Sequence, residues 1–206
     1  MNKTDAVLYI HGKGGKATEA NHFRQLFPVC DVIGIDYNGN TPWEAGKEIY
    51  ETVAKLKAEY NRIILIANSI GAYFSMNADI EKFISHAFFI SPIVDMQKLI
   101  ADMMLRAAVT ETELRECRVI HTNLDEDLSW EYLCYVRKHP VAWRIPTDIL
   151  YGSKDYLTSF DTITEFAQAH KASLTVMDGG EHWFHTDEQM YFLDSWIREK
   201  SGSLPA

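Results

Sequence analysis

The sequence predicts an α/β fold, a three-layer sandwich in which a mostly parallel sheet of about six strands lies between helices. Short, nearly continuous apolar runs alternate with segments of helical periodicity along most of the chain. Continuous apolar runs are typical of strands that helices cover on both faces. Alternation of strand and helix is typical of parallel strands joined by right-handed crossovers. The length of 206 residues fits a single domain, expected to span residues 1–206.

Six apolar runs are expected to form the strands of this sheet. Each is short and rich in β-branched or other apolar residues, which favour extended backbone in a buried sheet. They are Ala6–Ile10, Val32–Asp36, Arg62–Ala67, Ala87–Ser91, Asp148–Tyr151 and Leu174–Met177.

Helix-start signals stand between several of these runs. Thr41 and Glu44 have the spacing of a capping box, and Pro42 occupies the first helical position. The chain is expected to fray over its last residues, Ser201–Ala206. The other expected helix starts are Ser159, for a helix through Phe166, and a second capping box at Thr186 and Gln189.

One long stretch breaks the alternation of strand and helix. Between Pro92 and Arg144 no good strand stands out, and three segments have helical patterns. The stretch is too long for a simple crossover, so residues 93–144 are expected to form a helical cap insertion over one end of the sheet. The three helical segments are Asp95–Arg106, Thr110–Cys117 and Ser129–Lys138.

The composition excludes several classes of function. A net charge of −9 argues against binding of nucleic acid or an anionic membrane surface, since both need clustered Lys and Arg. No segment approaches the roughly 20 consecutive apolar residues of a membrane helix, and the N-terminus lacks the pattern of a signal peptide. The three cysteines are widely spaced and form no metal-type pair, so free thiols in a reducing cytoplasm are expected.

The most informative segment is Ile63–Ala72, where a buried strand runs directly into Ser69 and then into a helix. Small residues, Ala67 and Gly71, flank the serine two positions away, as a sharp strand-to-helix turn requires. Such a turn exposes the hydroxyl and places the Ile70 N–H at a helix N-terminus, where it can stabilise developing negative charge. Alanine replaces the first glycine of the strict G-x-S-x-G pattern. A serine that merely caps the helix is the alternative interpretation.

A serine hydroxyl needs a base to remove its proton, and the base needs an acid that orients it. Asp155 follows the fifth expected strand, and His182 lies in a glycine-rich loop after the sixth. Asp95, shortly after the fourth expected strand, is an alternative acid. His185 is an alternative base, although its place at the edge of the terminal helix is typical of a surface residue.

The order Ser69, Asp155, His182, with each residue after a strand, resembles the α/β-hydrolase fold superfamily. The loop at residues 11–15, His-Gly-Lys-Gly-Gly, resembles the HG-type loop of that superfamily. His11 is expected to brace this loop rather than to act in catalysis, and the resemblance implies a second oxyanion-hole donor, the Lys13 backbone N–H. The resemblance covers nearly the whole chain, although the first two strands usual in the superfamily are expected to be absent.

These residues predict a serine hydrolase that cleaves a carboxylic ester, or a thioester or amide, through an acyl-enzyme on Ser69. Small carboxylic esters are the default expectation. The expected partner is therefore a small-molecule acyl substrate, and the chemistry needs no cofactor and no metal ion.

Two other functions are open at this point. Gly12, Gly14 and Ala17 fit the dinucleotide fingerprint. Asp36 ends the next expected strand, where a ribose-binding acid would lie, so an NAD(P)-binding oxidoreductase is one alternative. It leaves the serine and the histidine unexplained. The other alternative is a catalytically inactive binding protein with the α/β-hydrolase fold.

Overall fold

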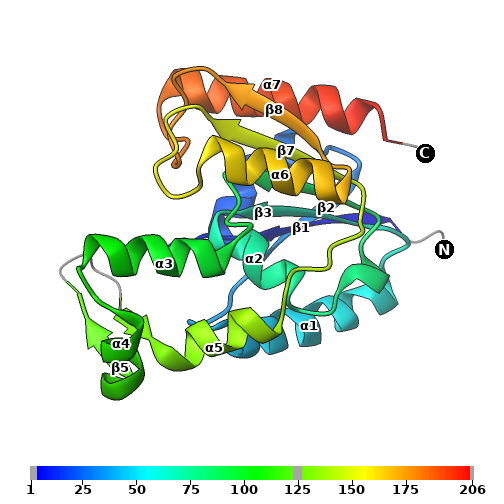
Figure 1. Ribbon diagram of the computed structural model, residues 1–206. Coiled ribbons are helices and arrows are strands. Elements are labelled where there is room, and N and C mark those ends of the chain that lie inside the picture. The colour runs from blue at the N-terminus through cyan, green and yellow to red at the C-terminus, as the bar shows by residue number, and fades with distance from the viewer. Residues whose placement is uncertain (1–3, 123–126, 205–206) are drawn as a thin grey trace. The chain divides into compact units, whose positions relative to one another are not determined.

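The computed structural model describes residues 4–122 and 127–204. Six strands form its main sheet, and each lies within two residues of an expected run: β1 (Asp5–Ile10), β2 (Cys30–Ile35), β3 (Ile63–Asn68), β4 (His86–Ile90), β7 (Thr147–Gly152) and β8 (Ser173–Met177). All neighbours pair in parallel, in the order β2-β1-β3-β4-β7-β8 (Figure 1). The predicted parallel sheet is therefore confirmed.

The order of the strands sets where a site can form. The chain passes from β1 outward to β2 and then returns to pair β3 with the other side of β1. Ile10, the last residue of β1, therefore lies beside Ile35 of β2 and Ala67 of β3. In parallel sheets, ligands bind outside the carboxyl ends of the strands at such a switch in strand order. The loop after β1 and the serine after β3 both begin at this point of the sheet.

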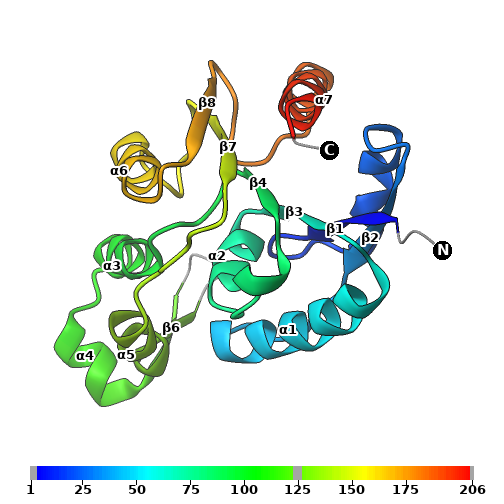
Figure 2. The ribbon, with the colours of Figure 1, turned by 90° about the vertical axis from the view of Figure 1, so that its right-hand side faces the viewer.

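Helices cover both faces of the sheet, which confirms the three-layer sandwich (Figure 2). Successive side chains of a strand point to opposite faces, so each strand supplies both layers. One face packs against η1 (Ala17–Gln25) and α7 (Asp187–Gly202), whose Phe23 and Trp196 share a buried cluster with Phe88 of β4. The other face carries α1 (Pro42–Glu59), α2 (Ile70–Met76), α6 (Phe160–His170) and the short turn η2 (Glu81–Phe83).

Side chains cap the helices at the predicted residues. Thr41 Oγ1 accepts the Glu44 N–H at 3.3 Å, and Thr186 Oγ1 accepts the Gln189 N–H at 3.3 Å. The second half of these two predicted capping boxes differs, whereas the box expected at Thr110 and Glu113 forms in full. The Glu44 carboxylate accepts from the Thr41 hydroxyl at 2.8 Å, and Gln189 Oε1 accepts from the His185 N–H at 3.1 Å. The caps thus form through the threonine hydroxyls.

Two helices extend beyond their predicted ends. The helix capped by Ser159 continues past Phe166 to His170, and α7 runs to Gly202. The expectation that the chain frays from Ser201 was therefore wrong for the first two residues of that segment, which complete the last turn of α7; its residues 205–206 lie outside the described part. Among the described helices, none is both long enough and apolar enough to span a membrane.

Residues 95–142 form a compact unit of their own, distinct from that of residues 4–94 and 143–204. Its three helices are α3 (Met96–Arg106), α4 (Glu111–Cys117) and α5 (Trp130–Lys138), as predicted. It also contains an antiparallel pair, β5 (Val119–His121) and β6 (Asp127–Ser129). The expectation of no strand in this stretch was wrong, because three-residue strands are too short to produce a periodic pattern. The interpretation of this unit as a cap stays a prediction.

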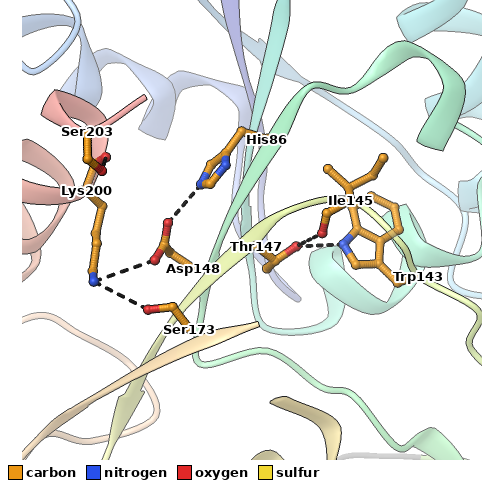
Figure 3. Close-up of polar contacts among 8 residues, drawn as sticks. All are labelled: His86, Trp143, Ile145, Thr147, Asp148, Ser173, Lys200 and Ser203. Atoms are coloured by element: carbon orange, nitrogen blue, oxygen red, sulfur yellow. Dashed lines mark hydrogen bonds and ion pairs between the residues drawn. The ribbon is translucent and has the colours of Figure 1, made fainter. Parts of the chain in front are cut away.

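A polar network ties together the amino ends of three strands (Figure 3). His86 Nε2 donates to Asp148 Oδ2 at 2.9 Å, and Lys200 Nζ lies 3.7 Å from the other carboxylate oxygen. Lys200 also donates to Ser173 Oγ at 3.4 Å. These contacts fasten β4, β7 and β8 to α7 at the end of the sheet opposite to Ser69. Their role is to hold the sheet together rather than to build the site.

Candidate active site

Ser69 stands in a strained turn between β3 and α2. Its φ of 53° lies in the left-handed region, which residues other than glycine rarely adopt. The Ser69 N–H donates to the Ile90 carbonyl at 3.0 Å, and the Ile93 N–H donates to the Ser69 carbonyl at 3.1 Å. A Cβ at Gly71 would lie 2.4 Å from the His11 carbonyl oxygen, so only glycine fits there. Backbone on both sides thus fixes the sharp turn expected at this serine.

The structure brings Ser69, His182 and Asp155 together in one hydrogen-bonded chain. Ser69 Oγ lies 2.8 Å from His182 Nε2, and His182 Nδ1 lies 2.7 Å from Asp155 Oδ2. An ionised carboxylate can only accept, so the imidazole carries its proton on Nδ1 and presents an unprotonated Nε2 to the serine hydroxyl. In this tautomer an imidazole can remove the hydroxyl proton.

The Asp155 carboxylate is buried, with none of its side chain exposed. A buried charge is tolerated only when hydrogen bonds satisfy it. While Oδ2 accepts from His182, Oδ1 accepts the N–H groups of Leu157 at 2.8 Å and Thr158 at 3.1 Å. Burial, and then the charge of this carboxylate, raise the pKa of the neighbouring Tyr151. The loop after β7 is therefore folded around the aspartate.

The alternative acid and the alternative base have other contacts. Asp95 caps α3 by accepting the Lys98 N–H at 2.9 Å. His185 Nδ1 lies 2.8 Å from the Trp183 carbonyl oxygen and 3.5 Å from a Glu181 carboxylate oxygen. The serine hydroxyl is thus in contact with the base favoured by the sequence, and that base is in contact with the favoured acid.

Close backbone packing joins the loop of the acid to the loop of the histidine. A Cβ at Gly152, the last residue of β7, would lie 2.5 Å from the Gly180 carbonyl oxygen. The Lys154 N–H donates to that same oxygen at 2.8 Å. No role was expected of Gly152 from the sequence. The signal that could have found it is the presence of a glycine shortly after each of two successive expected strands, Gly152 and Gly180. Their function is to let the two loops touch.

Residues 11–15 pass directly beside the serine. The Gly15 N–H donates to the Gly12 carbonyl at 3.1 Å, so residues 12–15 form a tight turn. Gly14, the third residue of this turn, has a φ of 71°, which favours glycine. A Cβ at Gly12 would lie 3.1 Å from Ser69 Cβ. The close approach expected of these glycines is therefore present.

The two backbone N–H groups predicted as oxyanion donors come from this turn and from α2. Lys13 is the second residue of the turn and follows the glycine that packs on Ser69. Ile70 is the first residue of α2, and the first N–H groups of a helix have no acceptor within that helix. Their joint action on a substrate is part of the function proposed below.

The acid of the dinucleotide alternative has a structural contact of its own. Asp36 Oδ1 accepts the Ala17 N–H at 2.9 Å and so caps the start of η1. The carboxylate expected to bind a ribose is thus used to begin a helix. Over residues 4–122 and 127–204, no group of three or more His, Cys, Asp or Glu side chains is arranged to hold a metal ion.

No family model matches the sequence, and no curated protein matches it. Solved structures match the fold. The mouse protein named alpha/beta hydrolase domain-containing protein 10 superposes with a TM-score of 0.76, over 100% of this chain and 92% of its own, at 15% identity. The chain has the α/β-hydrolase fold. Est1E from Butyrivibrio proteoclasticus (TM-score 0.78, 98% and 88% covered, 17% identity) and a Pyrococcus furiosus esterase (0.64, 97% and 81%, 18%) match as well.

His11 has the bracing role that was expected of it. The residue is buried, and its ring stacks on that of Tyr37, with centroids 4.4 Å apart and planes inclined by 6°. The Tyr37 hydroxyl donates to the His11 carbonyl at 2.8 Å. Nothing in the sequence pattern assigns Tyr37 this function, although its position directly after an expected strand end is an available signal.

A second brace connects β1 to η1. The Tyr9 hydroxyl donates to Glu19 Oε2 at 2.6 Å. Burial, the hydrogen bond to Glu19 and the charge of that carboxylate raise the pKa of Tyr9 far above its ordinary value. A Cβ at Gly15 would lie 2.9 Å from Glu19 Oε1, so this carboxylate also supports the glycine turn. Tyr9 lies inside an apolar run, so its position in the sequence predicts a strand residue but not the hydrogen bond to Glu19.

Proposed function

We propose that this protein is a serine hydrolase that cleaves carboxylic esters through an acyl-enzyme on Ser69. The observation that carries the proposal is the unbroken chain of contacts from Asp155 through His182 to Ser69, at 2.7 and 2.8 Å. The helix-capping interpretation does not account for the serine, because its side chain makes no capping hydrogen bond to α2.

Acylation uses His182 first as a base and then as an acid. Ser69 Oγ attacks the carbonyl carbon of the ester while its proton moves to His182 Nε2. The Asp155 carboxylate stabilises the imidazolium that forms. The bond between the carbonyl carbon and the alcohol oxygen then breaks, and the proton passes from Nε2 to the departing alcohol. The acyl group stays on Ser69.

Water completes the reaction. A water molecule attacks the acyl carbon and gives its proton to His182 Nε2; the bond to Ser69 Oγ breaks, the serine recovers the proton and the carboxylic acid leaves. Negative charge develops on the carbonyl oxygen in both halves of the reaction. We assign its stabilisation to the backbone N–H groups of Lys13 and Ile70, each worth about 2.7–4 kcal/mol in the transition state.

Proteins of the same fold support this class of reaction and suggest the first substrates. One matched protein is a Pyrococcus furiosus esterase, and another, Est1E, has been solved with ferulic acid bound. A carboxylic acid is the product that ester hydrolysis releases, so esters of small and of aromatic acids are the first to test. Thioesters and amides follow the same chemical scheme and complete the panel.

A fluorophosphonate probe tests the nucleophile directly. Wild-type protein should take up the label on Ser69, located by peptide mass spectrometry, and Ser69→Ala should take up none. Ser195→Ala is the matched control, since Ser195 is an exposed serine on α7. Hydrolysis of p-nitrophenyl esters should fall by about 10⁶-fold in Ser69→Ala. Folded wild-type protein that takes no label and cleaves no ester would instead favour the inactive binding protein.

A further inference from the structure

Tyr156 is an exposed aromatic residue directly beside the histidine of the site. It follows Asp155 in the chain, and 68% of its surface is exposed. Its ring centroid lies 6.2 Å from that of His182, with the two planes inclined by 59°. Exposed single aromatic residues are common on proteins, so exposure alone does not indicate a function for Tyr156. What Tyr156 can do depends on how the loop around it is held and on which residues lie next to it.

The loop that carries Tyr156 is fixed on both sides of this residue. Before it, the Asp155 N–H donates to the Gly152 carbonyl at 2.9 Å. After it, the Leu157 and Thr158 N–H groups both bind Asp155 Oδ1. The acid therefore sets the position of Tyr156 as well as that of the imidazole.

The far end of the loop is also anchored. The Tyr151 hydroxyl donates to the Thr158 carbonyl at 2.9 Å, and the Thr158 hydroxyl donates to the Pro92 carbonyl at 3.2 Å. A rigid loop thus presents a large aromatic ring beside the imidazole. The backbone that carries the ring is therefore positioned before any ligand arrives, which lowers the entropic cost of using the ring for binding.

The chemistry of the reaction indicates which part of the substrate would contact this ring. In the proposed acylation, His182 gives its proton to the oxygen of the departing alcohol, so the alcohol part of the ester must lie beside the imidazole. Building on the proposed function, we infer that Tyr156 forms the leaving-group subsite and makes the enzyme prefer esters of aromatic or bulky apolar alcohols. Stacking or edge contact between aromatic rings supplies the preference.

Trp183 is the neighbouring aromatic residue and serves as a contrast. It is as exposed as Tyr156, at 68%, and follows His182 in the chain. Its ring stacks on that of His185, with centroids 4.5 Å apart and planes inclined by 18°. The leaving-group subsite is therefore assigned to Tyr156, whose ring contact is with the catalytic imidazole.

The test compares acetate esters that differ only in the alcohol. Ethyl, phenyl and 2-naphthyl acetate all give the same acetyl-enzyme, so the alcohol can affect only acylation, which kcat/KM reports. Tyr156→Ala should lower kcat/KM for phenyl and 2-naphthyl acetate by about 3- to 10-fold and should leave ethyl acetate within a factor of two. Tyr156→Phe should retain the wild-type values. Comparing each substrate between variants cancels the intrinsic reactivity of its leaving group.

Two measurements separate a subsite from a merely structural role. Deacylation of the common acetyl-enzyme should proceed at the wild-type rate in Tyr156→Ala, and the far-UV circular dichroism spectrum of the variant should match that of the wild type. Tyr191→Ala is the matched control, because Tyr191 is an exposed tyrosine on α7, and it should change no kinetic constant. Trp183→Ala should alter the alcohol preference less than Tyr156→Ala does.

Several outcomes would overturn the inference. Equal loss for ethyl and 2-naphthyl acetate would make Tyr156 structural, and a loss that follows the acyl chain instead would place the ring on the acyl side. No change in any ester would remove Tyr156 from substrate binding. In each case an active, labelled wild-type enzyme leaves the proposed function standing. A wild-type protein that takes no fluorophosphonate label and cleaves no ester overturns both proposals together.

Discussion

Asp155 and His182 are joined by a 2.7 Å hydrogen bond between Oδ2 and Nδ1, and the aspartate side chain has no exposed surface. Two backbone N–H groups hold the other carboxylate oxygen, so the acid cannot turn away from the imidazole. The result is one tautomer and one ring orientation, with Nε2 directed at Ser69. In the proposed mechanism the acid prepares the base and takes no part in proton transfer itself.

Replacing the acid by its amide should therefore disable the base while keeping the fold. Asp155→Asn is expected to lower kcat by about 10³–10⁴-fold, because an amide that donates to Nδ1 selects the wrong tautomer. Hydrolysis of p-nitrophenyl acetate measures the effect. Asp95→Asn is the matched control and should keep full activity, since Asn caps a helix as well as Asp does. Loss of activity in Asp95→Asn alone would transfer the acid role to Asp95.

The glycine beside Ser69 gives a second prediction. In Gly12→Ala the added Cβ would lie 3.1 Å from Ser69 Cβ, so the serine or the loop must shift by a few tenths of an ångström. Because catalysis depends steeply on such displacements, kcat should fall by about 10-fold with little change in thermal midpoint. Gly202→Ala is the control, since a Cβ there meets no atom within 4 Å. Full activity in Gly12→Ala would show that the loop can move without consequence.

The central strands of the main sheet could be predicted because they are buried on both faces, as β1 and β3 are over most of their length. Burial on both faces removes the need for polar residues and leaves a continuous apolar signal. The pair β5 and β6 could not be predicted, because Val119–His121 and Asp127–Ser129 mix apolar and polar residues over three positions. At the start of α7, one of the two capping contacts could be predicted. The Thr186 hydroxyl accepts the Gln189 N–H as expected, but the partner of the Gln189 side chain depends on how the preceding loop folds.

The candidate site shows the same limit at the level of single residues. Ser69 and His182 could be found because each has an unusual local context, a strand-to-helix turn or a glycine-rich loop. Asp155 and Asp95 both follow strands, so order alone could not separate them, whereas their hydrogen-bond partners do. The bracing role of Tyr37 could not be predicted, because its partner His11 follows a different strand and the contact exists only after folding.

The brace under the glycine turn supports a third prediction. Tyr37→Phe keeps the ring that stacks on His11 but removes the hydroxyl that binds the His11 carbonyl. The free energy of unfolding should fall by about 1 kcal/mol, the net value of one hydrogen bond, and kcat should fall several-fold because the turn is less firmly held. Urea unfolding and ester hydrolysis measure the two effects. Tyr50→Phe on α1 should leave kcat unchanged, and an unchanged kcat in Tyr37→Phe would limit the brace to stability.

The network at the amino ends of the strands predicts a pH dependence of stability. Burial alone would raise the pKa of Asp148, but hydrogen bonds from His86 and Ser173 and the charges of His86 and Lys200 outweigh it and hold that pKa below its ordinary value. The unfolded chain therefore binds this proton first as the pH falls through about 4, so the carboxylate stabilises the fold above that pH and loses its contribution below it.

In urea unfolding, Asp148→Asn should be less stable than wild type by about 1.5–3 kcal/mol at pH 7, and the difference should shrink steadily between pH 4 and pH 3. Glu165→Gln, which changes an exposed carboxylate on α6, should track the wild type throughout. A gap between wild type and Asp148→Asn that stays constant down to pH 3 would contradict the depressed pKa and leave Asp148 as a neutral packing residue.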